Sequence, residues 1–150
     1  MTRAARSRQL LFVGRCNDTA TQMAEAFAAT LMFPVGIAAA SAGLTPTHVQ
    51  PWAVRVMAEI GLDISPQVAK PLLAFEPATI NTLVLVEHGI GLPLGFQAVP
   101  QIQWRLDPAA AMPRPADARL ADQRKLRDRV ELLVFRLITS GALSRPHASH

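Results

Sequence analysis

Apolar residues along this chain fall into two patterns: short continuous runs, and longer segments in which they recur every three or four positions. Continuous runs are typical of strands that are buried on both faces of a sheet. They predict strands over residues 10–13, 36–42, 82–86 and 102–106. The helical periodicity predicts α-helices that begin at residue 19 or 20, at 51 and at 116, and end at residues 32, 61 and 139.

The order of these segments predicts the fold class. Strands alternate with helices along the chain, which favours an α/β domain whose doubly wound parallel sheet has helices on both faces. Ser65-Pro66 predicts the start of a further short helix, because serine is a favourable N-cap and proline suits the first helical position.

The loop after the first strand is the expected ligand site, because ligands bind at the carboxyl ends of the strands in such sheets. An apolar strand, a tight polar loop and a helix together bind anions, since backbone N–H groups and the helix N-terminus face the bound group. The residues of this anion loop are Gly14, Arg15, Cys16, Asn17, Asp18, Thr19, Ala20 and Thr21. Asp107-Pro108 follows the fourth strand, so we expect it at the same edge of the sheet.

Composition bounds the organisation of the chain. Half of its 150 residues are hydrophobic and 17% are charged, which favours a globular protein with a sizeable core. We expect one domain over residues 9–141, with a basic flexible tail at residues 1–8 and a second flexible tail at residues 142–150. Cys16 is the one cysteine, so an internal disulfide framework is excluded and a reducing compartment is favoured.

The formal net charge of +4 raises the question of a nucleic-acid partner. The basic residues are dispersed, and on the last helix they alternate with acidic residues, a pattern typical of a solvated, ion-paired face. We therefore expect no nucleic-acid partner. No apolar stretch approaches the roughly 20 residues that span a bilayer, so we expect no membrane segment and a cytoplasmic location. The histidines show no ligand spacing, and we expect neither a metal ion nor another cofactor.

Several separated motifs make the chain resemble the low-molecular-weight protein tyrosine phosphatase and arsenate reductase family. They are Leu11-Phe12-Val13 with Asn17, the segment 22–27, Ser41-Ala42-Gly43, Lys70-Pro71-Leu72, Asp107-Pro108, and Arg124 with Arg127-Asp128. Their order and spacing cover the chain from about residue 10 to residue 138. The resemblance implies a phosphotyrosine protein phosphatase I-like fold with four parallel strands in the order 2-1-3-4. Gln22 favours the arsenate reductase branch.

The catalytic loop of that family holds a cysteine, five further residues and an arginine. Aligned on Asn17 and on the helix that follows, this chain places Gly14 at the cysteine and Ala20 at the arginine. Glycine provides no nucleophile, and alanine removes the guanidinium that would hold an oxyanion bidentately. The resemblance implies the general-acid position at Asp107, and a left-handed Asn17 that is hydrogen-bonded to Ser41 as loop support.

These losses predict a pseudo-enzyme that has lost catalysis and binds a ligand or a protein partner. We expect weak binding of a small oxyanion such as phosphate, arsenate or sulfate, because a carboxylate at Asp18 would oppose it at close range. One alternative is an active phosphatase or arsenate reductase that uses Cys16, whose place beside Arg15 at a helix N-terminus favours the thiolate. A second alternative is a scaffold protein that self-associates, for example as a homodimer.

The single cysteine and the absence of tyrosine limit which reactions and substrates of the family this chain could retain. A chain with one thiol cannot pass electrons along an intramolecular disulfide relay, and Glu87-His88-Gly89 after the third predicted strand brings no cysteine. The chain has no tyrosine, so the aromatic walls that grip a phosphotyrosine ring in related phosphatases are reduced to Trp52, Phe96 or Trp104.

Overall fold

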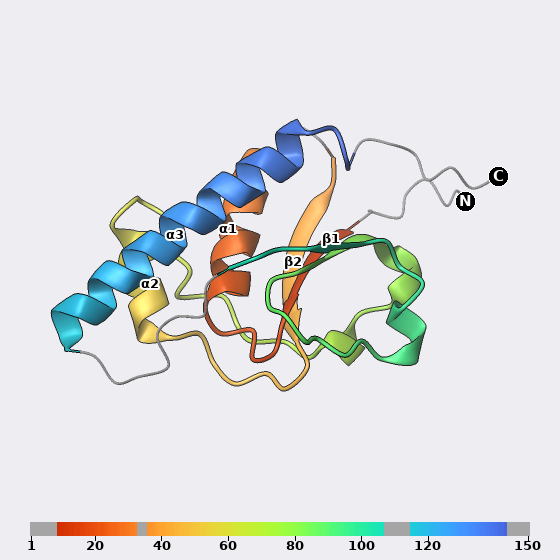
Figure 1. The fold of residues 1–150 in the computed structure, drawn as a ribbon, viewed down its shortest axis with the longest axis horizontal. Helices are drawn as coiled ribbons and strands as arrows, with labels where there is room; N and C mark the ends of the chain where they lie inside the picture. The colour runs from red at the N-terminus through yellow and green to blue at the C-terminus, as the bar shows by residue number, and fades with distance from the viewer. Residues whose placement is uncertain (1–8, 33–35, 107–114, 144–150) are drawn as a thin grey trace.

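The computed structural model describes residues 9–32, 36–106 and 115–143 (Figure 1). Its strands are β1 (Gln9–Gly14), β2 (Ala38–Gly43), β3 (Ile80–Leu85) and β4 (Gln101–Gln103). The α-helices are α1 (Ala20–Met32), α2 (Pro51–Ala58) and α3 (Ala116–Thr139), and the short 3-10 helices are η3 (Leu72–Ala74), η4 (Pro77–Thr79) and η5 (Leu94–Phe96). The strands pair in parallel in the order β2-β1-β3-β4, so the predicted α/β fold and its strand order are confirmed.

The larger core lies between the sheet and the α-helices. Successive residues of a strand point to opposite faces, so Leu10 and Phe12 of β1 share this core while their neighbours do not. Phe12 packs on Trp104 with the ring centroids 5.4 Å apart. The buried helical residues of this core include Met23, Phe27, Val56, Met57, Val130 and Val134. Figure 1 shows α3 lying across α1 and α2, which together cover one face of the sheet.

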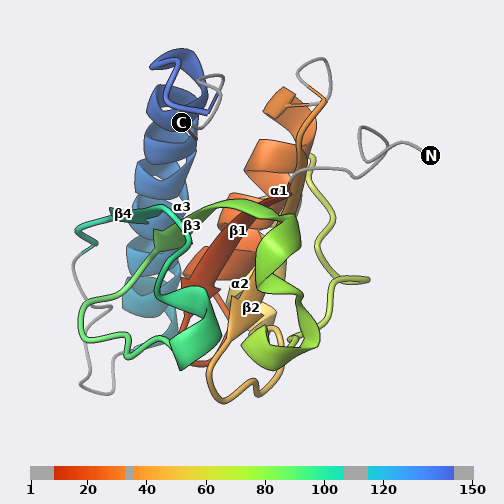
Figure 2. The ribbon, with the colours of Figure 1, turned by 90° about the vertical axis from the view of Figure 1, so that its right-hand side faces the viewer.

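The opposite face of the sheet is covered by shorter segments (green in Figure 2). Leu11 and Val13 of β1 pack there with Leu72 of η3, Phe96 of η5 and Val99. Helical turns thus cover both faces, as expected, but α1, α2 and α3 all pack against the same one.

Ser65-Pro66 does not begin a helix, and this prediction is wrong. The backbone makes a turn, in which the N–H of Gln67 donates to the carbonyl oxygen of Ile64 over 3.0 Å. Beyond the turn, Gln22 of α1 donates through Nε2 to the carbonyl oxygen of Val68 over 3.0 Å. The carbonyl oxygen of Val68, which a helix would have paired with a nearby backbone N–H, is therefore bound by the side chain of Gln22 instead.

The element ends differ modestly from the predicted ones. α2 ends at Ala58 rather than at residue 61, and β4 ends at Gln103 rather than at residue 106. Leu143 is buried in the helical core, two residues beyond the expected end of the domain at 141. The tails predicted at residues 1–8 and 144–150 lie outside the described residues.

Charged side chains join α2 to α3. Glu59, directly after α2, accepts hydrogen bonds from Arg124 Nη2 over 2.6 Å and from Arg127 Nη1 over 2.9 Å. Arg127 Nη1 also donates to the carbonyl oxygen of Val56 over 3.0 Å. The hydrogen bonds from Arg124 and then Arg127 lower the pKa of Glu59 from 4.5 to about 2. This cluster fixes α3 against α2, the helix whose start lies beside the anion loop.

Candidate functional site

The anion loop begins where β1 ends, at Gly14, which pairs in register with Gly43 of β2. Residues 44–50 continue from β2 beside the loop and donate backbone hydrogen bonds to its carbonyl oxygens. These bonds run from Leu44 to Gly14 (3.2 Å), from Thr45 to Arg15 (2.8 Å), from Thr47 to Cys16 (3.1 Å) and from Gln50 to Asp18 (2.9 Å). The loop is therefore held along most of its length by a second segment of backbone.

Gly43 permits this close approach. A Cβ atom at Gly43 would lie 2.9 Å from the backbone nitrogen of Asn17 and 3.0 Å from the carbonyl oxygen of Arg15. Both of these atoms belong to the backbone of the loop and cannot swing aside as a side chain can. A side chain at residue 43 would consequently push the two segments apart.

The same hydrogen bonds set the direction of the N–H groups of the loop. In a trans peptide the C=O and N–H groups point in opposite directions. Because the carbonyl oxygens face residues 44–50, the N–H groups of Arg15, Cys16, Asn17 and Thr19 are turned to the other side. Several N–H donors before the N-terminus of a helix are an arrangement that suits an anion.

A carboxylate of the chain itself lies on this donor side. The N–H of Arg15 donates to Glu87 Oε1 over 3.1 Å, and Arg15 Nε lies 3.7 Å from Glu87 Oε2. Glu87 follows β3, the neighbour of β1 in the sheet, and Gln103 Nε2 donates to its carbonyl oxygen over 3.0 Å. A Cβ atom at Gly14 would lie 2.9 Å from Glu87 Oε1. The carboxylate thus occupies the space that a side chain at residue 14 would enter.

The remaining charged and small residues of the loop lack the geometry of a cationic clamp. Ala20 is the first residue of α1 and packs against the helical core. The carboxylate of Asp18 is turned toward the start of α2, with Oδ2 3.5 Å from Gln50 Nε2. Arg15 is the loop residue that brings a guanidinium, and Glu87 is its ion-pair partner.

Cys16 lies in surroundings that disfavour a thiolate. Burial, followed by the charges of Asp18 and Glu87, raises the pKa of the Cys16 thiol above its ordinary value of 9.0, and Arg15 opposes this shift only in part. A thiol with a raised pKa is protonated at neutral pH and reacts slowly. Burial and the charges of Asp18 and Glu87 thus act against the thiolate that Arg15 and the helix N-terminus were predicted to favour.

Asn17 holds the turn of the loop. It is buried and adopts a φ of 53°, so the predicted left-handed conformation is confirmed. Its Nδ2 donates to Thr21 Oγ1 over 2.9 Å, and its Oδ1 accepts from the N–H of Lys70 over 2.8 Å. The predicted hydrogen bond to Ser41 is wrong, because the Ser41 hydroxyl donates instead to Glu25 Oε1 over 2.6 Å.

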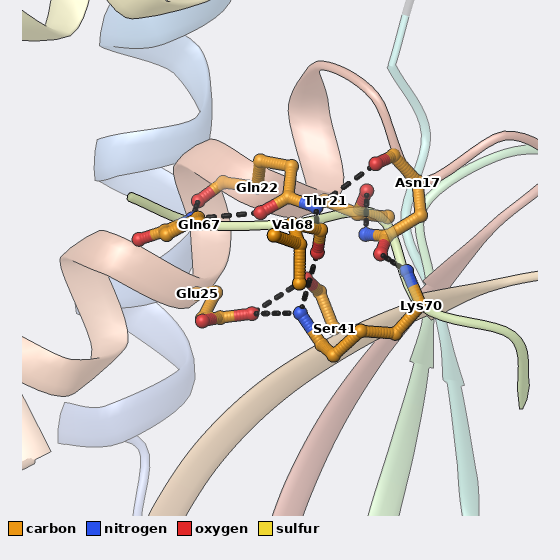
Figure 3. A network of polar contacts seen from close by, with 8 residues as sticks. All are labelled: Asn17, Thr21, Gln22, Glu25, Ser41, Gln67, Val68 and Lys70. Atoms are coloured by element: carbon orange, nitrogen blue, oxygen red, sulfur yellow. Dashed lines mark hydrogen bonds and ion pairs between the residues drawn. The ribbon is translucent and has the colours of Figure 1, made fainter. Parts of the chain in front are cut away.

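Gln22, fully buried at the start of α1, extends this polar network (Figure 3). Its Nε2 donates to the carbonyl oxygens of Asn17 (2.9 Å) and Val68 (3.0 Å), and its Oε1 accepts from Gln67 Nε2 (2.7 Å). Lys70 Nζ closes the network with a hydrogen bond to the carboxylate of Glu25, over 3.3 Å. The network fastens residues 67–70 to the loop and to α1.

The structure also locates the other residues that the sequence singled out, with the exception of Asp107. Asp107 lies outside the described residues. Phe96 and Trp104 are buried in the two cores, which leaves Trp52 as the half-exposed aromatic residue of the three. Within residues 9–32, 36–106 and 115–143, no group of three or more His, Cys, Asp or Glu side chains could hold a metal ion. No helix in that same part of the chain is long and apolar enough to cross a membrane.

Glu87 is the residue that sequence reasoning missed. One feature of the sequence pointed to it: Glu87 directly follows the third predicted strand. The order 2-1-3-4 places that strand beside the first strand, which leads into the anion loop. Acidic residues at the carboxyl end of a neighbouring strand reach the same edge of a parallel sheet. That rule places the end of β3 at the same edge as the loop, whereas the contact of the Glu87 side chain with Arg15 is seen only in the structure.

Comparisons with known proteins agree with the motifs. The family model described as low molecular weight phosphotyrosine protein phosphatase matches residues 9–102. The glutaredoxin arsenate reductase of Synechocystis sp. is 37% identical to this chain over 87 residues, which are 57% of the chain and 66% of that protein. The match thus spans slightly less than two thirds of that relative.

Solved structures share the fold. An arsenate reductase in the phosphate binding state superposes with a TM-score of 0.74 at 30% sequence identity, covering 89% of this chain and 98% of the other. An arginine phosphatase with a phosphorylated active site serine superposes with a TM-score of 0.71 and covers 91% of this chain and 97% of its own. At 18% identity, this second likeness concerns the fold alone.

Proposed function

Because the chain belongs to the low molecular weight phosphotyrosine protein phosphatase family, we propose that it is a member that has lost covalent catalysis and acts by binding. The contact between the anion loop and Glu87 carries this proposal. In the register of the family, Gly14 stands where the nucleophilic cysteine belongs. Glu87 Oε1 lies 2.9 Å from the place where the Cβ atom of such a cysteine would be.

The charge balance of the loop supports the same proposal. Covalent transfer of a phosphoryl or arsenyl group needs a nucleophile and a cation that holds the oxyanion. Glycine and alanine at residues 14 and 20 supply neither. Each carboxylate within about 4 Å of a bound dianion opposes it by roughly 4 kcal/mol per charge pair at an effective dielectric constant of about 20. Glu87 contacts the loop directly, so binding of a phosphate dianion by the unaltered chain should be weak.

Cys16 as a substitute nucleophile receives no support from its surroundings. Its pKa is raised by burial and by Asp18 and Glu87, whereas a catalytic thiol needs a lowered pKa. Gln22, six residues beyond Cys16, occupies the place of the arginine in that shifted register. It is buried and bound to backbone carbonyl groups.

Turnover assays on the wild-type chain and on Cys16→Ser test the proposal. The substrates are p-nitrophenyl phosphate, and arsenate with glutaredoxin and glutathione as reductants. We expect both chains to give rates equal to the buffer blank, while a cysteine-containing member of the family, run in parallel, turns over its substrate. Turnover by the wild type that disappears in Cys16→Ser would overturn the proposal and establish the thiol-dependent alternative.

Sedimentation velocity separates a binding role from self-assembly. A chain that acts on ligands or on other proteins is expected to sediment as one species whose mass does not grow with concentration. A mass that rises with concentration would instead favour the scaffold alternative, in which the partner is a second copy of the chain.

A further inference from the structure

We infer that Glu87 is a built-in ligand of the anion loop and closes it to external oxyanions until its carboxylate is moved. The inference rests on the proposed binding function, because it concerns the same loop. It adds the residue that controls access to that loop and an autoinhibitory contact as the means of control.

The carboxylate makes two contacts of the kinds that an oxyanion would make. Oε1 accepts from the backbone N–H of Arg15 over 3.1 Å, and Oε2 lies 3.7 Å from the guanidinium Nε of the same residue. Backbone N–H groups and guanidinium groups are the usual donors to phosphate and to carboxylate alike. An external oxyanion at this position would therefore compete with Glu87 for the same donors.

The side chain of Glu87 can leave without disturbing the sheet. Its side chain keeps 46% of its surface exposed, so the carboxylate can turn into solvent without crossing packed atoms. The backbone at Glu87 is held separately, by the hydrogen bond from Gln103 Nε2 to its carbonyl oxygen. A change of side-chain rotamer would thus vacate the loop while β3 and β4 stay in place.

Arg15 would supply the cation of the vacated loop. Residue 20 is alanine, so the arginine of the family is missing from the start of α1. The Arg15 guanidinium reaches the same side of the loop from its N-terminal end, where it meets Glu87. Asp18 is turned toward Gln50, which leaves Glu87 as the acidic group that contacts an N–H of the loop.

Calorimetric titration with inorganic phosphate, and separately with arsenate, tests the inference on Glu87→Ala, Glu87→Gln and the wild type. Glu131→Gln is the matched control, because it removes one negative charge from the exposed surface of α3. We expect Glu87→Ala to bind phosphate at least about tenfold more tightly than the wild type, as loss of one competing charge-assisted contact allows. We expect Glu87→Gln to bind more tightly than the wild type and Glu131→Gln to match it.

Replacing Arg15 by glutamine in the Glu87→Ala background should return the affinity toward that of the wild type. Equal affinities in Glu87→Ala and the wild type, or no binding by any variant whose circular dichroism shows it to be folded, would show the inference to be wrong. Turnover is measured on the same wild-type sample, so the two proposals are tested separately. Cys16-dependent turnover would overturn the proposed function. The difference in phosphate affinity between Glu87→Ala and the wild type decides the role of Glu87.

Discussion

The side-chain Oδ1 of Asn17 accepts a 2.8 Å hydrogen bond from the backbone N–H of Lys70, 53 residues further along the chain. Asn17 does this from a left-handed backbone conformation, with its Nδ2 bound to Thr21. One buried amide therefore shapes the anion loop and fixes a distant segment to it. The loop is thus held between β1 and α1 by contacts of Asn17 that do not involve residue 14, a glycine, or residue 20, an alanine.

Asn17→Ala should lower the free energy of unfolding by about 2–4 kcal/mol, because one buried and one partly buried hydrogen bond are lost and alanine disfavours a positive φ. Asn17→Gly is the matched variant. It loses the same hydrogen bonds but adopts the left-handed conformation freely, so it should be about 1 kcal/mol more stable than the alanine variant. Urea unfolding measures both values. A glycine variant less stable than the alanine variant would show that φ is not strained at this position.

Alanine at Gly43 and alanine at Gly14 should have different costs, although each added Cβ atom meets an atom at 2.9 Å. At Gly43 that atom is the backbone nitrogen of Asn17, and at Gly14 it is Oε1 of the flexible Glu87 side chain. A Cβ atom at Gly14 would also meet Cγ2 of the buried Thr21 at 3.0 Å. We expect Gly43→Ala to cost about 2–3 kcal/mol, as overpacking against fixed backbone atoms does, and Gly14→Ala to cost about 1–2 kcal/mol. Thermal and urea unfolding of the two variants check the order, which equal losses would contradict.

Gln22→Ala should be strongly destabilising. Its Nε2 and Oε1 satisfy Asn17, Val68 and Gln67 in a fully buried position, so truncation leaves unpaired carbonyl groups and a cavity. We expect a loss of about 2–4 kcal/mol in the free energy of unfolding. Gln97→Ala, a substitution on the exposed surface near η5, serves as the control and should cost less than about 1 kcal/mol. A Gln22→Ala loss as small as that of the control would show that the network contributes little.

Glu59 should make stability depend on pH in the acid range. Hydrogen bonds from Arg124 and Arg127 lower the pKa of Glu59 from 4.5 to about 2, so the folded state favours the ionised carboxylate. This contribution is present above about pH 4.5 and is lost as the pH falls toward about 2. The difference in free energy of unfolding between the wild type and Glu59→Gln should therefore shrink between about pH 5 and about pH 2.5.

Urea titrations at a series of pH values measure that difference. Addition of about 1 M NaCl should reduce it at neutral pH, because the Glu59 and Arg124 side chains are partly exposed and salt screens them. Glu131→Gln should show no such trend. A difference that does not change with pH would mean that the ion-pair cluster stabilises the fold through packing alone.

Cys16 should be alkylated slowly. Burial and the charges of Asp18 and Glu87 raise its pKa above 9.0, so the rate of reaction with iodoacetamide should reach its midpoint above that pH. Glu87→Gln should lower the midpoint, since it removes one of the charges that raise the pKa. Mass spectrometry follows the labelling, with Glu131→Gln as the control of unchanged midpoint. A midpoint clearly below that of free cysteine, about pH 8.5, would show that Cys16 is a reactive thiol.

Local sequence pattern predicted the α/β class of this protein and the location of its loop, and the family resemblance added the strand order. The apolar runs of β1 and β3 and the periodic stripes of α1 and α3 predict their elements, because burial on one or two faces leaves a period that can be read directly. The left-handed Asn17 was implied by the family resemblance, and asparagine is among the few residues that tolerate that conformation.

Contacts between distant segments were decided only by the tertiary structure. Ser65-Pro66 reads locally as a helix start, yet Gln22 binds the backbone that follows, and Ser41 turns to Glu25 instead of Asn17. Glu87 lies 72 residues from Arg15 in the chain, and the carboxylate reaches the loop only because β1 and β3 are neighbours in the sheet. The sequence by itself thus determined the residues on which the proposed loss of catalysis rests, glycine at residue 14 and alanine at residue 20. Packing of the strands decided which charge lies against the loop, because electrostatic interactions depend on distances that sequence separation does not reveal.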